Sequence, residues 1–407
     1  MNNFTAELNQ RLDEIRRQGL YRELRRVDSP QSPRIVVNGR TLLNFSSNDY
    51  LGLADHPVLK EAAVKAVERF GSGSGASRLI CGSLAPHHEL ETALAAFKGT
   101  ESALTFSSGY ATAIGTICAL AGKDDILVLD KLVHASIVDA ARLSGAKLRV
   151  FAHNDLNELE DILRWAGQRA APARRPNAII LTESVFSMDG DLAPLREIVA
   201  LKEKYGAWLM VDEAHATGIF GPQRRGLADE LSVSDQIEIQ MGTLGKALGS
   251  SGGYICGPRV LIDYLINRAR SFIFSTAPVP AAAAVARAAV ELVQSAEGKA
   301  RCEKLTSLAD QVKTGLAQTG WPATAGSAII PLIIGAESDA LDAAGALLER
   351  GIFVPAIRYP TVARGEARLR VTLTAAHAPG DVSTLLTALK AVPHTATRVA
   401  QPASPDA

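Results

Sequence analysis

The sequence predicts an α/β protein with two domains, a large domain on a mainly parallel sheet and a smaller α+β domain at the C-terminal end. Two observations predict it. The chain has 407 residues, which suits two domains better than one small core. From about residue 55 to residue 270, helical stretches alternate with short apolar runs rich in valine, isoleucine and leucine, and such runs are typical of buried parallel strands.

Composition and charge are those of an ordinary soluble protein. Apolar residues make up 47% of the chain, charged residues 21%, and the formal net charge is zero, which favours neither nucleic acid nor an anionic membrane as a partner. No run reaches the ~18 apolar residues of a membrane span. The N-terminus has no apolar signal core and is too acidic for a transit peptide, so we expect a cytoplasmic protein.

Cysteine usage argues against metal and disulfide chemistry. The four cysteines are Cys81, Cys118, Cys256 and Cys302. They lie far apart and form no C-x-x-C pair, so we expect reduced thiols and no structural zinc.

The N-terminal segment, residues 1–50, is predicted to hold a helix and a hairpin. Apolar residues recur at helical spacing between residues 4 and 26, at Phe4, Leu8, Leu12 and Ile15. This pattern predicts an amphipathic helix that packs on the main body. Asn38-Gly39 lies inside the stretch Arg34–Leu43 and is the strongest short signal for a hairpin turn.

Residues 51–285 are predicted to form the large domain. Its expected strands are Ala103–Phe106, Asp125–Leu129, Leu148–Phe151, Ala178–Thr182, Ala207–Val211 and Ile237–Met241. Each run is short and bounded by turn residues, so helical crossovers are expected between neighbouring strands.

Residues 286–391 are predicted to form the smaller domain, reached through a long alanine-rich helix over residues 281–300. Its expected strands are Ile329–Ile334, Phe353–Pro355 and Arg368–Leu373, and its expected helices cover residues 338–350 and 380–391. The tail, residues 392–407, is rich in proline, alanine, threonine and serine and is predicted to be disordered.

The most informative residue is Lys246, which lies in the glycine-rich segment Gly242–Gly249 about thirty residues after Asp212. Glycines let a backbone approach a ligand closely, and a buried lysine with a lowered pKa suits a Schiff base. Pyridoxal phosphate needs such an amine for its aldehyde and a carboxylate for its ring nitrogen. The alternative is a solvated lysine in a turn.

Asp212 follows Trp208–Val211 and therefore ends an expected strand, where ligands of open α/β sheets bind. Its carboxylate could hold a pyridinium nitrogen protonated. His215 follows three residues later and could hydrogen-bond the phenolic oxygen of the cofactor. The alternatives are a helix N-cap for Asp212 and a partly buried histidine with other partners for His215.

Three further strand ends carry candidate cofactor residues. Ser107–Thr112 follows a strand and opens a helix, and the backbone N–H groups at such an N-terminus suit a phosphate. His134 follows the next strand and could stack on a pyridine face, or it could be an ordinary histidine at a helix start. Ser187 follows a fourth strand, just before the turn residues Asp189-Gly190.

Each of these signals is weak alone, but they converge on one edge of one sheet. Near the C-terminus, Arg358 adjoins Pro360, and an arginine beside a rigid loop suits two-point capture of a carboxylate. Arg364 and Arg368 are interpreted as surface charge.

Together these motifs resemble the α-oxoamine synthase family of pyridoxal-phosphate enzymes, which have the aspartate aminotransferase-like fold (fold type I). The resemblance covers about residues 5–391. It is carried by the stretches Asn44–Leu53, Val185–Asp191, Asp212–Gly218, Thr243–Lys246, Ile357–Val362 and Leu369–His377.

The resemblance implies roles for the cofactor residues. Lys246 would form the Schiff base, Asp212 would pair with the ring nitrogen, and His215 and Ser187 would hold the phenolic side. His134 would stack on the ring, and Lys246, His134, Asp212 and His215 would be the catalytic set. The phosphate would lie by Gly109, Tyr110 and Thr243.

The resemblance also implies substrate and partner residues. The amino acid or the acyl group would contact Arg22, Asn48, His134, Arg358 and Thr361. Active sites of the family lie between two subunits, so we expect a homodimer in which Ser275 and Thr276 serve the partner's cofactor.

Within the family, Ile357–Val362 and Leu369–His377 resemble the enzyme of biotin synthesis. The expected reaction is a decarboxylative condensation of L-alanine with a pimeloyl thioester of CoA or of acyl carrier protein. The rivals are the sister enzymes glycine C-acetyltransferase, 5-aminolevulinate synthase and serine palmitoyltransferase; Tyr359 is more usual in the second of these. A non-catalytic regulator would need a DNA-binding domain, for which residues 1–30 are too short.

Overall fold

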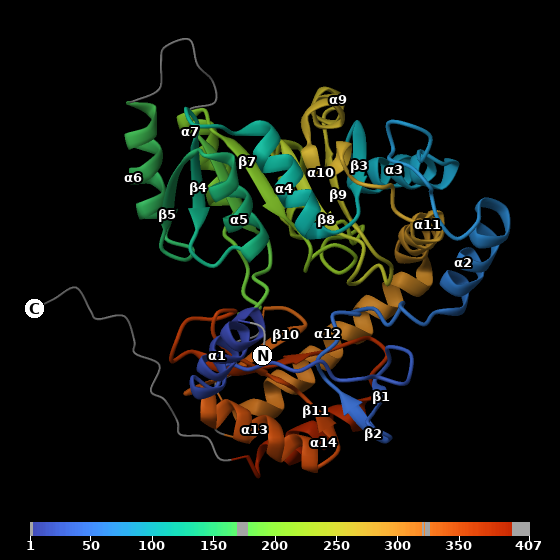
Figure 1. Cartoon of the computed structure of the whole chain (residues 1–407), viewed down its shortest axis with the longest axis vertical. Helices are drawn as coiled ribbons and strands as arrows, with labels where there is room; N and C mark the ends of the chain where they lie inside the picture. The colour runs from blue at the N-terminus through green and yellow to red at the C-terminus, as the bar shows by residue number, and fades with distance from the viewer. Residues whose placement is uncertain (1–2, 169–177, 320, 322–325, 393–407) are drawn as a thin grey trace, which may run out of the picture. The chain divides into compact units, whose positions relative to one another are not determined.

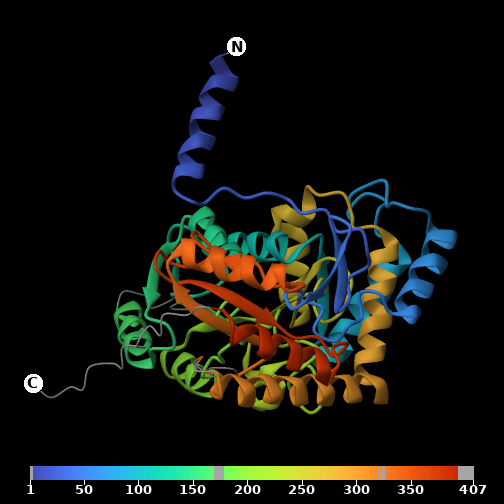
Figure 2. The same cartoon turned by 90° about the horizontal axis from the view of Figure 1, so that it is seen from below.

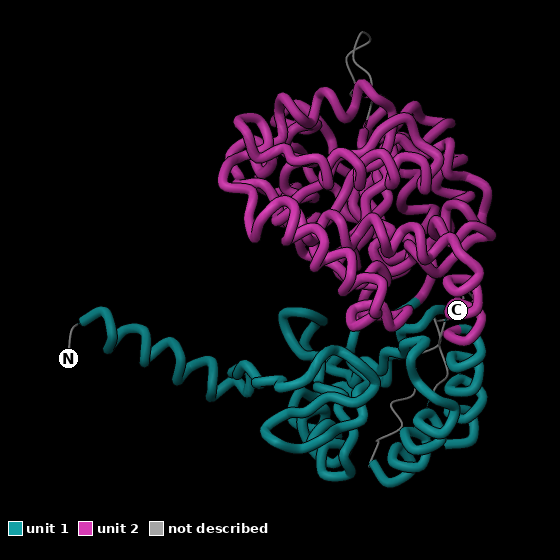
Figure 3. The backbone as a smooth tube through the Cα atoms, turned by 90° about the vertical axis from the view of Figure 1, so that its right-hand side faces the viewer, with its two compact units in different colours: residues 1–47, 188–190, 306–407 teal, residues 48–187, 191–305 magenta. Residues whose placement is uncertain are grey.

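The computed structural model describes residues 3–168, 178–319, 321 and 326–392. The chain folds into two compact units, drawn in different colours in Figure 3. The sheet unit comprises residues 48–187 and 191–305, and the terminal unit comprises residues 1–47, 188–190 and 306–407. The division therefore lies close to residue 48 at one end and within a long helix at the other.

The sheet unit is built on seven strands in the order β3-β9-β8-β7-β6-β4-β5. The strands are β3 (Ser102–Phe106), β4 (Ile126–Asp130), β5 (Lys147–Phe151), β6 (Ile179–Glu183), β7 (Trp208–Asp212), β8 (Ile239–Thr243) and β9 (Gly253–Gly257). All neighbours are parallel except those of β9, which runs antiparallel to β3 and β8. The predicted fold class, an α/β fold on a mainly parallel sheet, is confirmed.

Helices cover both faces of this sheet (Figure 1). On one face, α4 (Gly109–Leu120), α5 (Ala135–Ser144), α9 (Arg259–Arg268) and α10 (Arg270–Ile273) pack on strand side chains in one continuous apolar core. On the other, α6 (Leu156–Gly167) and α7 (Leu195–Tyr205) pack together and against β4, β5 and β7. Burial on both faces explains why most strands are apolar at every position.

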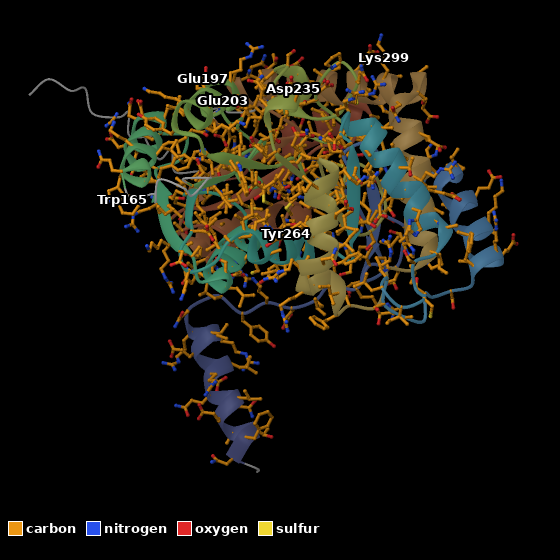
Figure 4. The ribbon with its side chains drawn as sticks, turned by 90° about the horizontal axis from the view of Figure 1, so that it is seen from above. Trp165, Glu197, Glu203, Asp235, Tyr264 and Lys299 are labelled. Carbon is orange, nitrogen blue, oxygen red and sulfur yellow. The ribbon has the colours of Figure 1, made fainter. Side chains whose placement is uncertain are left out.

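Helix α7 shows how a crossover helix meets the sheet. Its buried side chains include Leu195, Ile198 and Val199, at helical spacing. Glu197 and Glu203 stand on its outer face (Figure 4). The helix ends at Gly206, whose φ of 65° is the left-handed conformation that glycine adopts without cost.

The remaining elements of the sheet unit are α2 (Pro57–Phe70), α3 (Ala85–Lys98), α8 (Leu227–Glu230), the 3₁₀ turn η1 (Ser234–Gln236), α11 (Pro280–Gln294) and most of the first half of α12 (Ala296–Ala317). Helix α11 packs on α2 and α3. The predicted single helix over residues 281–300 is wrong: Ser295, in an extended conformation, ends α11, and α12 starts anew at Ala296.

All six predicted strands of the large domain are present, shifted by one or two residues, but the prediction missed β9. This strand has glycine at both ends, Gly253 and Gly257, and glycine normally weakens a strand. Here it is required: a Cβ on Gly253 would lie 2.8 Å from Gly109 Cα, so only glycine lets β9 pass the start of α4.

The terminal unit holds two small sheets. One has the order β1-β2-β11 and the other β10-β13-β12. The elements are β1 (Arg34–Val37), β2 (Arg40–Asn44), β10 (Ile329–Gly335), α13 (Glu337–Glu349), β11 (Ile352–Phe353), β12 (Ala356–Ile357), β13 (Ala367–Thr372) and α14 (Pro379–Leu389). The hairpin predicted at Asn38-Gly39 is confirmed, with both residues at positive φ. The strand predicted at Phe353–Pro355 is instead two two-residue strands.

The N-terminal helix differs from its prediction. Helix α1 (Asn3–Arg17) ends well before residue 26, and none of its residues is buried. Figure 2 shows that no element of its own unit lies along it. The predicted packing on the main body is therefore wrong for the described chain. The predicted disorder of the tail concerns residues that, apart from Val392, lie outside the described ones.

Candidate active site

The carboxyl ends of the parallel strands place the candidate residues along one edge of the sheet unit. The segments that follow β3, β4, β6, β7 and β8 contain Gly109, His134, Ser187, His215 and Lys246, respectively, and Asp212 is the last residue of β7. Because β3, β4, β6, β7 and β8 all run in the same direction, their carboxyl ends meet at this edge, where ligands of open α/β sheets bind.

A chain of hydrogen bonds joins Lys246 to the interior of the sheet unit. Lys246 Nζ lies 2.7 Å from His215 Nε2. On the other side of the ring, His215 Nδ1 lies 2.5 Å from the hydroxyl of Tyr50. Tyr50 is fully buried and His215 is 5% exposed, whereas Lys246 is partly exposed. The lysine amine is therefore held at the edge of the sheet and is reachable by a ligand.

Asp212 has the contact expected from its capping interpretation. Its Oδ1 accepts a hydrogen bond from Ala214 N at 2.9 Å, which is a turn-capping contact. Its Oδ2 accepts no hydrogen bond from any of the residues that the structure describes. Although the residue is only 6% exposed, this second oxygen remains available to a ligand that carries a proton or a positive charge.

A second carboxyl group, Glu183, stands beside Asp212. The two residues are register partners on β6 and β7, so their side chains project to the same face of the sheet. Burial raises the pKa of Glu183 well above its usual value, and the charge of Asp212 raises it further. Two adjacent carboxyl groups do not both ionise readily, and burial favours the neutral form of Glu183.

His134 lies within electrostatic reach of both principal residues. Desolvation lowers the pKa of its imidazole although the residue is exposed overall; the charge on Asp212 opposes this shift and the charge on Lys246 adds to it. His134 Nδ1 accepts a hydrogen bond from Ser136 N at 3.2 Å. This contact caps α5 and fixes the orientation of the ring, which confirms that the histidine also has the structural role of a helix start.

The start of α4 forms a compact anion site. Ser108 Oγ accepts from Ala111 N and caps the helix. A Cβ on Gly109 would lie 3.9 Å from Thr243, so Thr243, at the end of β8, adjoins the helix N-terminus. Thr243 in turn donates to Gly252 O at 3.0 Å. Free N–H groups at such a terminus favour a phosphate.

Ser187 and Tyr110 complete the sequence-predicted residues of this unit. Ser187 is 7% exposed, and its backbone N–H, together with that of His134, points to the Glu183 carboxyl group and favours its charged form. Tyr110 is 49% exposed and donates to Asp139 Oδ2 at 2.9 Å. The ring of Tyr110 therefore stands beside the α4 terminus without being fixed by the core.

Sequence reasoning missed Tyr50. In the stretch Asn44–Leu53 only Asn48 is predicted to be a site residue, and its Oδ1 lies 3.3 Å from the Tyr50 hydroxyl. A signal was present: a tyrosine in a polar stretch before an apolar Leu-Gly-Leu. What the sequence could not show is that its hydroxyl meets His215, 165 residues later.

The predicted substrate residues Arg22, Arg358 and Thr361 belong to the terminal unit. Arg358 donates to the carbonyl groups of Gly19 and Tyr21, and Arg22 donates to Tyr359 O at 3.1 Å. Desolvation, and then the charge of Arg22, lower the pKa of Arg358, so the two guanidinium groups are close. Thr361 N donates to Arg358 O at 3.0 Å, which makes this loop a compact cationic turn.

The interpretation of Arg368 as surface charge is wrong. Arg368 is 2% exposed, and its Nη1 pairs with Asp189 Oδ1 at 2.6 Å. Charged and apolar residues alternate along β13, which suggests that its arginines face solvent. Both arginines, Arg368 and Arg370, are nevertheless buried. Arg364 is exposed, as expected, and lies over the ring of Tyr359.

The four cysteines are all free thiols. Within the described ranges, no cluster of three or more histidine, cysteine, aspartate or glutamate side chains could hold a metal ion. Among the helices that the structure describes, none has the length and apolar character needed to cross a membrane.

Comparison with known proteins identifies the relatives of this chain. The family model for class I and II aminotransferases matches residues 40–389. The 8-amino-7-oxononanoate synthase of Geotalea daltonii is 50% identical over 380 residues, which are 93% of this chain and 95% of that protein.

Two solved structures share the fold. A serine palmitoyltransferase from S. paucimobilis, solved with a bound PLP–myriocin adduct, has a TM-score of 0.88 at 31% identity, over 95% of this chain and 96% of that one. The 8-amino-7-oxononanoate synthase of Francisella tularensis has a TM-score of 0.73 at 27% identity, over 86% of this chain and 97% of that one.

Proposed function

Since the chain belongs to the class I and II aminotransferase family and, within it, to the 8-amino-7-oxononanoate synthases, we propose that it condenses L-alanine with a pimeloyl thioester. The alanine Cα forms a bond to the acyl carbonyl carbon, and the thiol leaves. The bond between Cα and the alanine carboxylate then breaks to release CO₂. The Cα proton is removed first and a proton is returned last, which gives 8-amino-7-oxononanoate.

The cofactor is pyridoxal 5'-phosphate, which supplies an electron sink for the carbanion at Cα. The residues at the sheet edge fit it. The Lys246 amine would hold the aldehyde, and the available Asp212 oxygen would hold the protonated ring nitrogen. His215 and Ser187 would meet the phenolic oxygen, and His134 would cover the ring. The α4 terminus with Gly109, Tyr110 and Thr243 would take the phosphate.

One observation carries this proposal: an accessible lysine amine and a charged buried carboxylate end neighbouring parallel strands of one sheet. The proposed role of Lys246 is double. Its amine would hold the cofactor, and the same amine, when free, would take the Cα proton of alanine and later return one. The contact to His215 Nε2 at 2.7 Å gives the freed amine a hydrogen-bonding partner while it holds that proton.

The proposed substrate residues are Arg22, Asn48, His134, Arg358 and Thr361. Arginine suits a carboxylate because its fork of N–H donors matches the two oxygens. Both the alanine and the pimeloyl chain carry a carboxylate. In the described chain Arg358 is bound to backbone carbonyl groups, so we propose that a substrate carboxylate replaces these weaker acceptors.

The proposed setting is a cytoplasmic homodimer that accepts the acyl group from CoA or from an acyl carrier protein, with Ser275 and Thr276 facing the cofactor of the partner. In support of a dimer, large apolar side chains are exposed on neighbouring segments: Ile80 is 80% exposed and Phe274 is 71% exposed. The bridge Ser77↔Thr276 joins these segments.

A substrate matrix tests the reaction. The purified protein, loaded with pyridoxal phosphate, is mixed with L-alanine, glycine or L-serine and with pimeloyl-, acetyl-, succinyl- or palmitoyl-CoA. We expect release of free thiol and CO₂ in equal amounts only with L-alanine and pimeloyl-CoA. Turnover with glycine but not with alanine would overturn the assignment.

The alternative is a sister enzyme of the glycine C-acetyltransferase, 5-aminolevulinate synthase or serine palmitoyltransferase type. The higher TM-score of the serine palmitoyltransferase favours the last of these types, and Tyr359 favours the 5-aminolevulinate synthase type. Sequence identity favours the first proposal, at 50% against 31%. The matrix separates them, because the productive pair would then be glycine with acetyl-CoA, glycine with succinyl-CoA or L-serine with palmitoyl-CoA, respectively.

A further inference from the structure

We infer that Tyr50 is a positioning residue that sets which nitrogen of His215 carries the proton and thereby what His215 Nε2 offers to the active site. The inference rests on the proposed function, in which His215 meets the phenolic oxygen of the cofactor. It concerns a residue that touches neither cofactor nor substrate and acts through the imidazole alone.

The geometry leaves His215 one orientation. The Tyr50 hydroxyl lies 2.5 Å from His215 Nδ1, and the two rings meet edge to face with centroids 5.9 Å apart. Tyr50 belongs to the segment before α2, whereas His215 follows β7. Tyr50 is 0% exposed, so this hydrogen bond is made in the interior of the sheet unit. With Nδ1 occupied in the interior, Nε2 is the nitrogen directed at Lys246.

The direction of the two hydrogen bonds is coupled through the ring. In a neutral imidazole one nitrogen donates and the other accepts. If the Tyr50 O–H donates to Nδ1, Nε2 carries the proton and is a donor. If Nδ1 carries the proton and donates to the Tyr50 oxygen, the hydroxyl can turn to Asn48 Oδ1 at 3.3 Å, and Nε2 accepts. A hydroxyl is suited to this place because it can both donate and accept.

The two arrangements match two states of Lys246. A free lysine ammonium can only donate, so it requires Nε2 as acceptor. With the cofactor held by Lys246, Nε2 would instead serve the phenolic oxygen, an acceptor that requires Nε2–H. Tyr50 lets His215 change between these states without leaving Nδ1 unsatisfied, in the way that a second residue commonly orients a catalytic or metal-binding histidine.

Three titratable groups lie next to His215. Tyr50 faces Nδ1, Lys246 faces Nε2, and Asp212 precedes the histidine on its own segment. Phenylalanine at position 50 keeps the ring packing and removes the hydroxyl. His215 Nδ1 then loses the hydrogen bond from the Tyr50 hydroxyl, which favours the Nε2–H form, so we expect the imidazole to keep its proton on Nδ1 when the cofactor is bound.

The test compares Tyr50→Phe with Tyr254→Phe. Tyr254 is also fully buried in the sheet unit, and its hydroxyl contacts Thr217 Oγ1 at 2.9 Å, so both variants lose one buried hydroxyl contact. The first readout is ¹⁵N NMR of the His215 ring. We expect wild type and Tyr254→Phe to change from Nδ1–H to Nε2–H when pyridoxal phosphate binds, and Tyr50→Phe to keep Nδ1–H.

The second readout is the pH titration of bound-cofactor absorbance. A donor on the phenolic oxygen stabilises its anion and makes the adjoining Schiff-base nitrogen less basic. Its loss in Tyr50→Phe should raise the titration midpoint by about one pH unit, a tenfold change in the proton equilibrium, while Tyr254→Phe stays at the wild-type midpoint. An unchanged tautomer and midpoint in Tyr50→Phe would overturn the inference. Failure of wild type to bind pyridoxal phosphate would instead overturn the proposed function.

Discussion

At the scale of single residues, two neighbouring carboxyl groups at the active-site edge differ in their surroundings. Asp212 and Glu183 are register partners, yet burial and the charge of Asp212 raise the pKa of Glu183 well above its usual value. Pushing the pKa values of adjacent groups apart is how one site obtains a charged and a neutral carboxyl group at the same pH. The charged one is in the place proposed for the ring nitrogen.

This separation predicts opposite outcomes for two isosteric substitutions. Asp212→Asn removes the charge that holds the ring nitrogen protonated and should lower kcat by several powers of ten, each worth about 1.4 kcal/mol of barrier. Burial favours the neutral form of Glu183, so Glu183→Gln should stay within about tenfold of wild type. Steady-state kinetics on both cofactor-loaded variants checks this; equal losses would contradict the assignment of charge.

The part of the candidate site that follows strand ends could be predicted, because the end of an apolar run can be recognised in the sequence alone. Lys246, Asp212 and His134 were found in this way, and the structure brings their charges within reach of one another. Tyr50 and Glu183 could not be assigned, because their roles depend on a neighbour in another part of the chain. Arg368 was misjudged for the same reason, since its partner Asp189 is far away in sequence.

At the scale of elements, a histidine that hydrogen-bonds two carboxylates connects the loops that carry the candidate residues. His153 follows β5; its Nδ1 lies 3.0 Å from Asp130 at the end of β4, and its Nε2 lies 2.7 Å from Asp191 in the loop after β6. These partners raise the pKa of His153 to about 10, against desolvation. The positive ring therefore ties the loop of His134 to the loop of Ser187.

The contacts of His153 with Asp130 and Asp191 predict that the stability of the protein depends on pH. Because the folded pKa, about 10, lies above the ordinary value of 6.5, the contribution of His153 is complete below pH 6.5 and is lost as the pH rises toward 10. The difference in unfolding free energy between wild type and His153→Gln should therefore shrink by up to about 1.4 kcal/mol per pH unit across that range.

Urea unfolding at pH 6, 8 and 10 measures this difference, with His56→Gln as the control. His56 pairs with a single carboxylate, Glu297, at 3.0 Å in the same unit. A wild-type advantage over His153→Gln that stayed constant from pH 6 to pH 10 would show that the ring is not charged in the folded protein.

The fold itself was predictable where elements obey the usual periodicities. Apolar strands buried on both faces and amphipathic crossover helices leave plain patterns, so the parallel part of the sheet was found. Strand β9 was not, because glycine at both of its ends reflects the close approach of α4 at Gly109 and not a turn. The apolar face of helix α1 was predicted to be buried, but no residue of this helix is buried in the described chain.

At the scale of the whole molecule, the proposed dimer should depend on the exposed apolar side chains near Ile80 and Phe274. Analytical ultracentrifugation is expected to show a dimer for wild type. Ile80→Glu places a charge on this patch and should weaken dimerisation at least tenfold, since an unpaired charge in an interface is costly.

A matched control is available on α9. Val260 is 74% exposed, comparable to Ile80, and lies in another part of the sheet unit. Val260→Glu should leave the sedimentation of the protein unchanged. If both substitutions, or neither, altered the association state, the patch would not be the interface.

In the proposed function, Lys246 carries the cofactor. Reduction of the pyridoxal phosphate-loaded protein with borohydride turns a Schiff base into a stable bond, and mass spectrometry of its peptides then locates the label. We expect one pyridoxyl phosphate group per chain, on the peptide that contains Lys246, and none on Lys246→Ala, which should also lack turnover. Label on a different lysine, or turnover retained in Lys246→Ala, would contradict it.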